Sequence, residues 1–276
     1  MLRKKNLMII IIFFILLLFF ACPQVSTNDG TKQSFEEFNI TFDRNTGNAI
    51  GTMTDQTVSE GNSVNLNLNA FVRGGFDFNR WNTSPDGSGT DYSDGANFTM
   101  GGADVTLYAQ WVWKTYSLRN TGPSGGLIFY INPNASTDGW KYLEAAPSDQ
   151  SSGTKWSNVI AAIGTTNTGI GTGNANSLAI VGQTGHTSSA AQLCLNLSVT
   201  GGGIIYDDWF LPSLDELDLM YDNLHAHSTG GFSNVVYASS SEQDTLSFHG
   251  QNFNTGAQPK FCSKGDSFYV RAARSF

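Results

Sequence analysis

Short stretches of alternating apolar and polar residues recur through the first part of the chain. Residues 38–42, 64–68 and 105–111 each alternate with a period of two, which is the pattern of a strand with one buried face. Between the second and third stretches lies SPDGSGTDYSDG, which is dense in residues that form turns. The pattern predicts a mostly β module of short strands and tight turns over residues 38–113.

The pattern changes after about Lys114. Residues 127–131, with the sequence LIFYI, form a continuous apolar run that predicts a buried strand. The segment from residue 132 to about residue 173 shows no periodicity, so we expect a long loop region there. Three further short strands are expected around residues 235–237, 248–253 and 268–272.

Two helices are predicted in this second part of the chain. In TSSAAQLCLNL, residues 187–197, one helical face is formed by Ala190, Leu193, Cys194 and Leu197. In PSLDELDLMYDNL, residues 212–224, Ser213 and Glu216 have the spacing of a capping box. The buried stripe expected of this second helix consists of Leu214, Leu217, Tyr221 and Leu224. Strands together with helices predict an α+β domain over residues 114–276.

The N-terminus carries the pattern of an export signal. The basic triplet RKK precedes an unbroken apolar run over residues 7–21, which has the length of a signal-peptide core and is shorter than a membrane-spanning helix. The junction FFAC resembles a relaxed bacterial lipobox in which Cys22 accepts the lipid. An uncleaved anchor helix is the alternative. We expect a lipoprotein signal peptide over residues 1–21 and a flexible, polar tether over residues 22–37.

Lipidation bears on the cysteine count. The chain has three cysteines, and an odd number leaves one unpaired in an exported protein. If Cys22 carries acyl chains, Cys194 and Cys262 can form one disulfide in an oxidising compartment. The alternative is two buried, unpaired thiols, because the sequence does not show whether the two approach within bonding distance.

Composition and charge narrow the class of ligand. Charged residues make up 14% of the chain, and the net charge is −8. Removal of the RKK triplet with the leader leaves 12 basic residues against 23 acidic ones. Such a surface repels nucleic acid, so no nucleic-acid partner is expected.

Four sequence segments over residues 38–113 point to a known family. They are FNITFDRNTG, GTMTDQTVSEGNSVNL, GFDFNRW and the closing DVTLYAQW. Together they resemble one Listeria–Bacteroides repeat, the B-repeat type of internalin proteins. The resemblance implies a small β-grasp-like module of exported proteins that serves as a spacer or adhesive unit and not as an enzyme. It also implies that the core includes Phe76, Phe78, Trp81 and Trp111.

The second part of the chain also resembles a family. The segments TGPSGGLIFYI, LEAAPSDQSSGTKW, DWFLPSLDELDLMYDNL, YASSSE and YVRAARSF are similar to the Lcl C-terminal domain family, which is related to C-type-lectin-like folds. The resemblance implies that a strand near the domain start pairs with the last strand, that two helices are present, and that a loop-rich region carries any ligand site. Ala238 departs from the family, whose members commonly have an aromatic residue before SSSE.

Catalytic and metal-binding motifs are weak. The segment GPSG at residues 122–125 is not the elbow that exposes a serine nucleophile. The run GIGTGN at residues 169–174 lacks the third glycine and the preceding strand of a phosphate-binding loop, so we interpret it as a surface loop. Asp222, His225 and His227 lack a further metal ligand at a recognisable spacing. We expect no catalytic residue, no metal site and no cofactor.

Calcium is the alternative to that expectation, because C-type lectins bind sugars through carboxylate and amide oxygens around this ion. Asp207-Asp208-Trp209 and Gln258-Pro259-Lys260 are only loosely similar to the lectin motifs. Lys260 would repel a cation.

Candidate ligand-binding residues lie in the second part of the chain. Trp209 offers a stacking face, while Asp207, Asp208 and Glu242 can accept hydrogen bonds from sugar hydroxyls. Each has a structural alternative: Trp209 can be buried, and Glu242 can satisfy backbone donors in a loop. A sulfated glycan would need cations, and the one cluster consists of Lys260, Lys264, Arg271 and Arg274. Arg271 and Arg274, three apart in one expected strand, point to opposite faces.

These observations predict a protein of the bacterial cell envelope, lipid-anchored at the outer membrane or cell surface. Its membrane contact is the lipid anchor. A two-domain chain presents a non-catalytic binding or adhesion domain to a glycan or protein ligand. The alternatives are a structural envelope protein without a soluble ligand and an enzyme on a lectin-like fold, for which only Cys194 and Cys262 could supply the chemistry.

Overall fold

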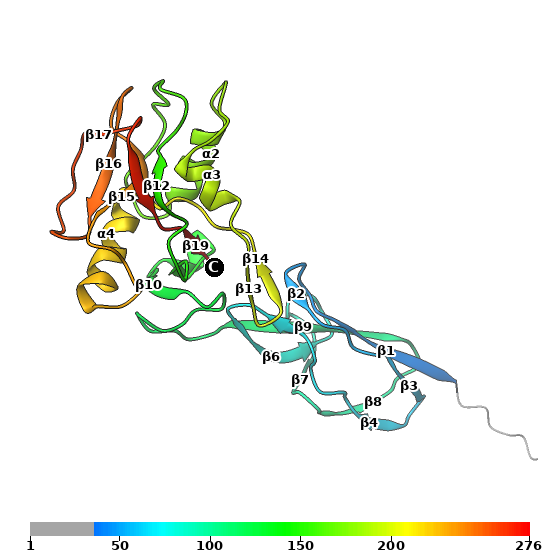
Figure 1. Cartoon of the computed structure of the whole chain (residues 1–276). Helices are drawn as coiled ribbons and strands as arrows, with labels where there is room; N and C mark the ends of the chain where they lie inside the picture. Colours follow the sequence, from blue (N-terminus) through cyan, green and yellow to red (C-terminus); the bar gives the residue numbers. More distant parts are fainter. Residues whose placement is uncertain (1–35) are drawn as a thin grey trace, which may run out of the picture. The chain divides into compact units, whose positions relative to one another are not determined.

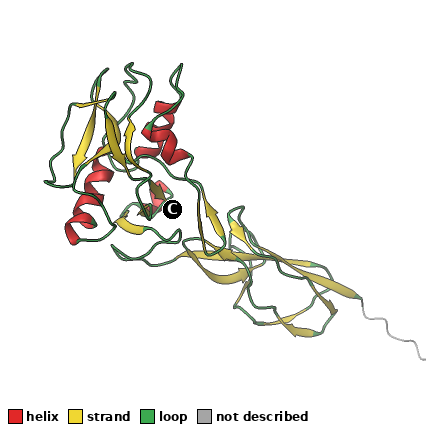
Figure 2. Cartoon of the chain, viewed as in Figure 1, coloured by secondary structure: helices red, strands yellow, loops and turns green. Residues whose placement is uncertain are grey.

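The computed structural model describes residues 36–276. The predicted signal peptide, the lipid-accepting Cys22 and nearly all of the tether lie outside the described residues. In the described part strands predominate, and the helices all follow residue 113 (Figure 2). No helix within residues 36–276 has both the length and the apolar character needed to span a bilayer.

The first part, residues 37–113, is built only of strands. They are β1 (Glu37–Asp43), β2 (Ala49–Ile50), β3 (Gln56–Ser59), β4 (Ser63–Asn65), β5 (Val72–Arg73), β6 (Phe76–Asn82), β7 (Asp91–Tyr92), β8 (Asn97–Thr99) and β9 (Val105–Trp113). Five of them form a sheet in the order β3-β1-β9-β6-β7. The first and last long strands, β1 and β9, run parallel at its centre, with Ile40 opposite Val105. The predicted strands at residues 38–42 and 105–111 are confirmed.

The core of the first part centres on one tryptophan. Trp81 is fully buried, and its ring lies 4.9 Å from that of Phe42 and 4.9 Å from that of Phe78 between ring centroids. Trp81 was expected in the core. Phe78, Phe76 and Trp111 were also expected there and are half-buried. Phe78 and Trp111 pack against this core, whereas Phe76 lies at the end of β6, opposite Trp113. That position leaves Phe76 available to a neighbouring cavity.

The second part, residues 114–276, mixes strands and helices. The strands are β10 (Leu127–Ile131), β11 (Tyr142–Ala145), β12 (Ser151–Lys155), β13 (Val199–Gly201), β14 (Ile204–Tyr206), β15 (Val236–Glu242), β16 (Ser247–Asn252), β17 (Cys262–Ser263), β18 (Ser267–Val270) and β19 (Ala273–Ser275). The helices are α1 (Ala135–Asp138), α2 (Gly173–Val181), α3 (Ala190–Leu195), α4 (Leu214–Asn223) and the 3₁₀ helix η1 (His225–His227). Three sheets result, in the orders β10-β11-β19, β12-β18-β15-β16-β17 and β13-β14.

The first and last strands of this part share a sheet without pairing directly. β10 and β19 each pair antiparallel with β11, which lies between them. The expectation that a strand near the domain start pairs with the last strand is therefore met by β11, whereas β10 does not pair with β19. All four residues of β11 are buried, so this strand occupies the central position that two-sided pairing requires.

The helices agree only in part with the sequence prediction. At α4 the Ser213 hydroxyl accepts from the Glu216 backbone N–H, and the Glu216 carboxylate accepts from the Ser213 N–H, so the capping box is confirmed. In α3 the predicted apolar face is wrong at Leu193, which is exposed. The helix α2 lies in a segment without a predicted element, and it packs against α3 (Figure 1).

The predicted cationic cluster is not present as such. β18 ends at Val270, so Arg271 and Arg274 do not share one strand. Arg271 and Arg274 are buried against carboxylates, and Lys264 is buried as well. Only Lys260 of the four cations is exposed. Burying a cation is costly unless a carboxylate pairs with it, and each of the other three has such a partner.

Cys194 and Cys262 are both free and buried in the same hydrophobic core. The predicted disulfide between them is not formed in the structure. Cys194 is on α3, whereas Cys262 begins β17 and directs its sulfur toward the Pro259 carbonyl oxygen, at 3.8 Å. Both sulfurs therefore act as small apolar groups within the core.

Residues 37–276 form one compact unit. The β9 strand continues directly into the second part, where the Tyr142 hydroxyl donates to the Lys114 carbonyl oxygen and accepts from the Tyr116 N–H. Gly75 has φ +79°, and a Cβ there would overlap the ring of Phe276. A glycine is therefore required where the β5–β6 turn meets the C-terminal residues.

Candidate functional site

A cavity of about 560 Å³ lies where the two parts meet. This volume is in the range typical of small-molecule sites. The second part contributes side chains from β14, the residues after it, and the C-terminal strand. The first part contributes side chains from β5, β6 and the end of β9. The lining residues used below are Arg73, Phe76, Trp113, Tyr206, Asp207 and Asp208.

One wall of the cavity is held by a buried ion-pair network. Arg274 donates from Nε and Nη2 to the two carboxylate oxygens of Asp208, at 2.7 and 2.9 Å, and from Nη1 to Glu144, at 3.1 Å. The Glu144 carboxylate also accepts from the backbone N–H groups of Gly126 and Ser124. A bidentate arginine–carboxylate contact fixes orientation as well as distance, so Asp208 is held in one position at the cavity wall.

The charge states of this network follow from its contacts. Burial raises the pKa of Glu144, and the contacts with Ser124 and Arg274 only partly oppose this effect. For Arg274 burial lowers the pKa, but the hydrogen bonds and attraction to Asp208 and Glu144 outweigh it, so the net pKa is raised. Arg274 therefore stays charged beneath the cavity.

Asp207 and Asp208 are the two predicted ligand-binding residues that the structure brings together at the cavity. Both are exposed, and they directly follow the β13–β14 hairpin. Asp208 is engaged by Arg274, whereas Asp207 makes no side-chain hydrogen bond or ion pair within residues 36–276. An ionised carboxylate accepts hydrogen bonds only, so Asp207 offers acceptor oxygens to a ligand that carries donors.

The remaining predicted ligand-binding residues lie elsewhere. Trp209 is buried in the core, with its indole N–H donating to the Tyr206 carbonyl oxygen at 3.0 Å. It presents no free ring face, so Trp209 is a core residue and not a stacking surface for a sugar. Lys260 is exposed but does not line the cavity.

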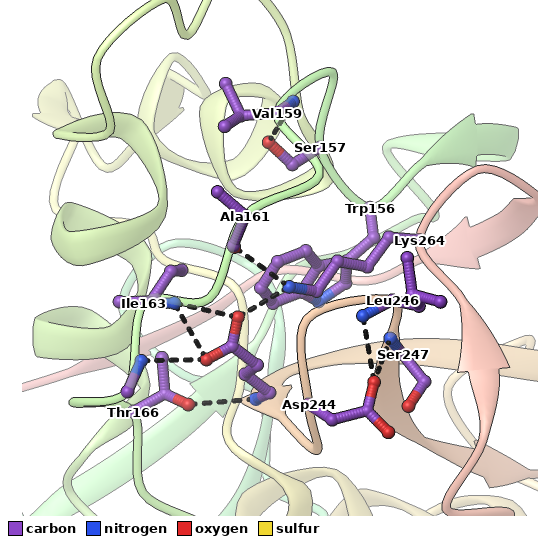
Figure 3. Close-up of polar contacts among 12 residues, drawn as sticks. Trp156, Ser157, Val159, Ala161, Ile163, Thr166, Asp244, Leu246, Ser247 and Lys264 are labelled. Carbon is purple, nitrogen blue, oxygen red and sulfur yellow. Dashed lines mark hydrogen bonds and ion pairs between the residues drawn. The ribbon is translucent and has the colours of Figure 1, made fainter.

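Glu242 belongs to a closed ion pair with Lys264, and Figure 3 labels Lys264 together with Trp156 and Ala161 beside it. The Lys264 ammonium contacts its carboxylate at 2.5 Å, donates to the Ala161 carbonyl oxygen and lies 4.8 Å from the centroid of the Trp156 ring. Glu242 accepts in addition from the backbone N–H groups of Ile163 and Gly164, at 2.9 and 2.8 Å. Burial raises the pKa of Glu242, but these hydrogen bonds outweigh it and the net pKa is lowered. The pair fastens the loop that contains residues 161–166.

The glycine-rich run at residues 169–174 encloses an internal carboxylate. Glu216 accepts from the Gly171 N–H at 2.8 Å, and a Cβ on Gly173 would lie 2.8 Å from the Phe210 ring. Burial raises the pKa of Glu216 to about 7. The run is therefore not a free surface loop: its close approach to a buried carboxylate explains why glycines are needed.

The described part of the chain assembles no metal-binding group from its histidines and cysteines. Within residues 36–276 no three side chains of the His, Cys, Asp or Glu type cluster closely enough to hold a metal ion. His225 packs against the rings of Tyr221 and Phe253. Burial raises the pKa of the Cys194 and Cys262 thiols, which disfavours the thiolate form that nucleophilic chemistry uses.

The sequence analysis did not identify the contribution of the first part to the cavity. Phe76 was expected only as core, and Arg73 and Trp113 were not singled out. The available signal was FVRGGF, residues 71–76, where two consecutive glycines beside an arginine and an aromatic residue indicate close backbone contact. What the glycines contact depends on tertiary structure and could not be predicted from the sequence.

Comparison with protein families supports one half of the sequence interpretation. Residues 38–110 match the Listeria-Bacteroides repeat domain, so the resemblance inferred for this segment is confirmed. The match ends just before the final residues of β9.

Two curated relatives come from Evansella cellulosilytica. One, named "Putative Gly-rich membrane protein", is 31% identical over 117 residues, which is 41% of this chain and 14% of the relative. The other, named "Putative membrane protein", is 39% identical over 56 residues, which is 20% of this chain and 8% of the relative. The chain thus spans only a small part of the length of these relatives.

Proposed function

We propose that the chain is a lipid-anchored protein of the bacterial cell envelope whose C-terminal, lectin-like domain binds a glycan without catalysis. The observation that carries this proposal is the cavity beside Asp207 and Asp208. Two carboxylates and partly exposed aromatic rings line one hollow of ligand size. Sugars present hydroxyl donors at their edges and apolar C–H groups on their faces, so this combination of groups suits them.

The fixed position of Asp208 favours the binding of a ligand at this wall. Its two oxygens are oriented by Arg274, which is itself held by Glu144. Groups held in place before binding lose less entropy when a ligand arrives.

The membrane location rests on separate observations. The sequence of residues 1–22 resembles a lipoprotein signal with its acceptor cysteine, and the two Evansella relatives are named as membrane proteins. Export is also consistent with a Listeria-Bacteroides repeat at residues 38–110. The anchor would hold the binding domain outside the cytoplasm.

A glycan array tests the proposal. The full chain, purified in mild detergent and fluorescently labelled, is applied in the presence and absence of a chelator. We expect a restricted set of glycans to bind, and we expect Asp207→Asn to reduce that binding at least tenfold. Asp266→Asn, which changes an exposed aspartate that does not line the cavity, should leave binding unchanged.

The same array separates the alternatives. Loss of binding in the chelator would indicate that calcium completes the site. Binding to no glycan at all would overturn the proposal and favour a structural envelope protein or a protein ligand.

A further inference from the structure

Among the arginines of residues 36–276, Arg73 is partly buried and has no carboxylate partner. Its guanidinium carbon lies 3.6 Å from the centroid of the Phe76 ring, and its Nε is buried with no hydrogen-bond partner within residues 36–276. Arg80, Arg271 and Arg274 each pair with a carboxylate. An unpaired, partly buried guanidinium is costly, and burial lowers its pKa without removing its charge.

Arg73 lines the cavity together with an aromatic stack. Phe76, which it contacts, stacks on Trp113 with 4.3 Å between ring centroids and 29° between ring planes. Trp113 is half-buried and also lines the cavity. The first part of the chain therefore supplies one positive, fork-shaped donor group and one aromatic surface.

The second part of the chain supplies negatively charged acceptor groups to the same cavity. Asp207 and Asp208 line the same cavity, and Asp207 has no side-chain partner within residues 36–276. A ligand that satisfies both walls must carry an anionic group for Arg73 and hydroxyl donors for Asp207. It must also offer an apolar face to Trp113.

A sugar ring with a carboxylate substituent meets all three requirements. Arginine binds planar carboxylates bidentately, sugar hydroxyls donate to carboxylates, and the C–H face of the ring packs on an aromatic side chain. We propose that this cavity recognises a uronic acid unit of an anionic glycan, with Arg73 and Trp113 from the repeat and Asp207 from the lectin-like domain as the contacting residues.

This inference rests on the proposed glycan-binding function and deepens it. It also changes the role of the Listeria-Bacteroides repeat, which becomes half of the binding site in addition to a spacer. The excess of acidic residues on the chain repels an anionic glycan at long range, so Arg73 provides local selectivity within an unfavourable overall field. Raising the salt concentration screens that repulsion.

Isothermal titration calorimetry with a matched ligand pair tests the inference. The ligands are trigalacturonic acid and its fully methyl-esterified form, which differ in charge and share the same sugar skeleton. The full chain should bind the acid at least tenfold more tightly than the ester. In Arg73→Gln the two ligands should bind with equal affinity, because the variant keeps polarity and loses the charge.

Three variants act as controls. Arg80→Gln lies in the same repeat but pairs with Asp91 away from the cavity, and it should keep the preference for the acid. Asp207→Asn should weaken acid and ester alike. Arg73→Lys keeps the charge and loses the fork geometry, so it should show an intermediate preference. If thermal unfolding shows that Arg73→Gln does not fold, Arg73→Lys takes its place in the test.

Two results would overturn the inference. Equal affinity of the unchanged chain for acid and ester is one, and an undiminished preference in both Arg73 variants is the other. If neutral glycans bind on the array and uronates do not, only this inference fails. If no glycan of either kind binds, the proposed function fails with it.

Discussion

Lys264 and Glu242 show how a charge can be kept inside this protein. Lys264 is fully buried, and the Glu242 side chain is 5% exposed. The ammonium and the carboxylate contact each other, and backbone groups of the 161–166 loop complete their hydrogen bonds. Removing one partner of such a pair leaves an uncompensated charge, which is more costly than losing an exposed pair.

We therefore expect Lys264→Met to lower the free energy of unfolding by about 3 kcal/mol. The matched control is Arg80→Met, which removes an exposed pair whose side chains are 38% and 53% accessible and should cost less than about 1 kcal/mol. Urea unfolding followed by tryptophan fluorescence measures both. Equal losses in the two variants would contradict the structural role of the buried pair.

The raised pKa of Glu216 predicts how the free energy of unfolding depends on pH. Burial raises its pKa to about 7 in the folded state, so between about pH 4.5 and 7 the folded chain holds a proton that the unfolded chain has released. The free energy of unfolding should fall as pH rises through this window, by on the order of 3 kcal/mol. Glu144, whose pKa is also raised by burial, acts in the same direction.

Comparison with Glu216→Gln isolates this contribution. His249, whose pKa is lowered by burial, contributes an opposite slope in both proteins. Urea unfolding at several pH values should show a steeper decline for the unchanged chain than for the variant. The same slope in both would refute the assignment of the raised pKa to Glu216.

At the scale of elements, the helices and strands that could be predicted from the sequence are those whose formation depends on neighbouring residues. The α4 helix could be predicted because its capping box and apolar stripe are encoded in consecutive residues. The β10 strand has the predicted bounds, since LIFYI is apolar throughout and bounded by turn residues. The α2 helix could not be predicted, because its apolar residues follow no helical stripe and its start is fixed by distant residues such as Glu216.

The start of α2 gives a test at this scale. We expect Gly173→Ala to lower the free energy of unfolding by about 1–3 kcal/mol, because its Cβ would lie 2.8 Å from the Phe210 ring and 2.9 Å from the Leu211 carbonyl oxygen. Gly169→Ala is the control, since the nearest atom to its Cβ would be 3.9 Å away. Thermal unfolding compares them. A Gly173→Ala variant as stable as the Gly169→Ala variant would contradict the packing described.

At the scale of the whole molecule, the candidate site combines residues that the sequence keeps far apart. Asp207 and Asp208 were predicted because acidic residues beside a tryptophan suggest sugar binding. Arg73 and Trp113 were not, because only the contact between the β5–β6 turn and the C-terminal residues brings them to the same cavity. Burial of Trp209 and pairing of Glu242 likewise depend on tertiary structure.

Lipid anchoring at Cys22 is predicted from the N-terminal sequence alone, independently of the binding site. Metabolic labelling with radioactive palmitate should mark the unchanged chain and leave Cys22→Ser unmarked. Cys194→Ser, which alters a buried thiol, should label as strongly as the unchanged chain. Persistent labelling of Cys22→Ser would exclude Cys22 as the lipid acceptor.

The most direct test of the account is a crystal structure of the chain with trigalacturonic acid at saturating concentration. We predict one sugar unit in the cavity, with its carboxylate at the Arg73 guanidinium, its ring on Trp113 and a hydroxyl donating to Asp207. A sugar bound at another surface, or a cavity without sugar under these conditions, would contradict it.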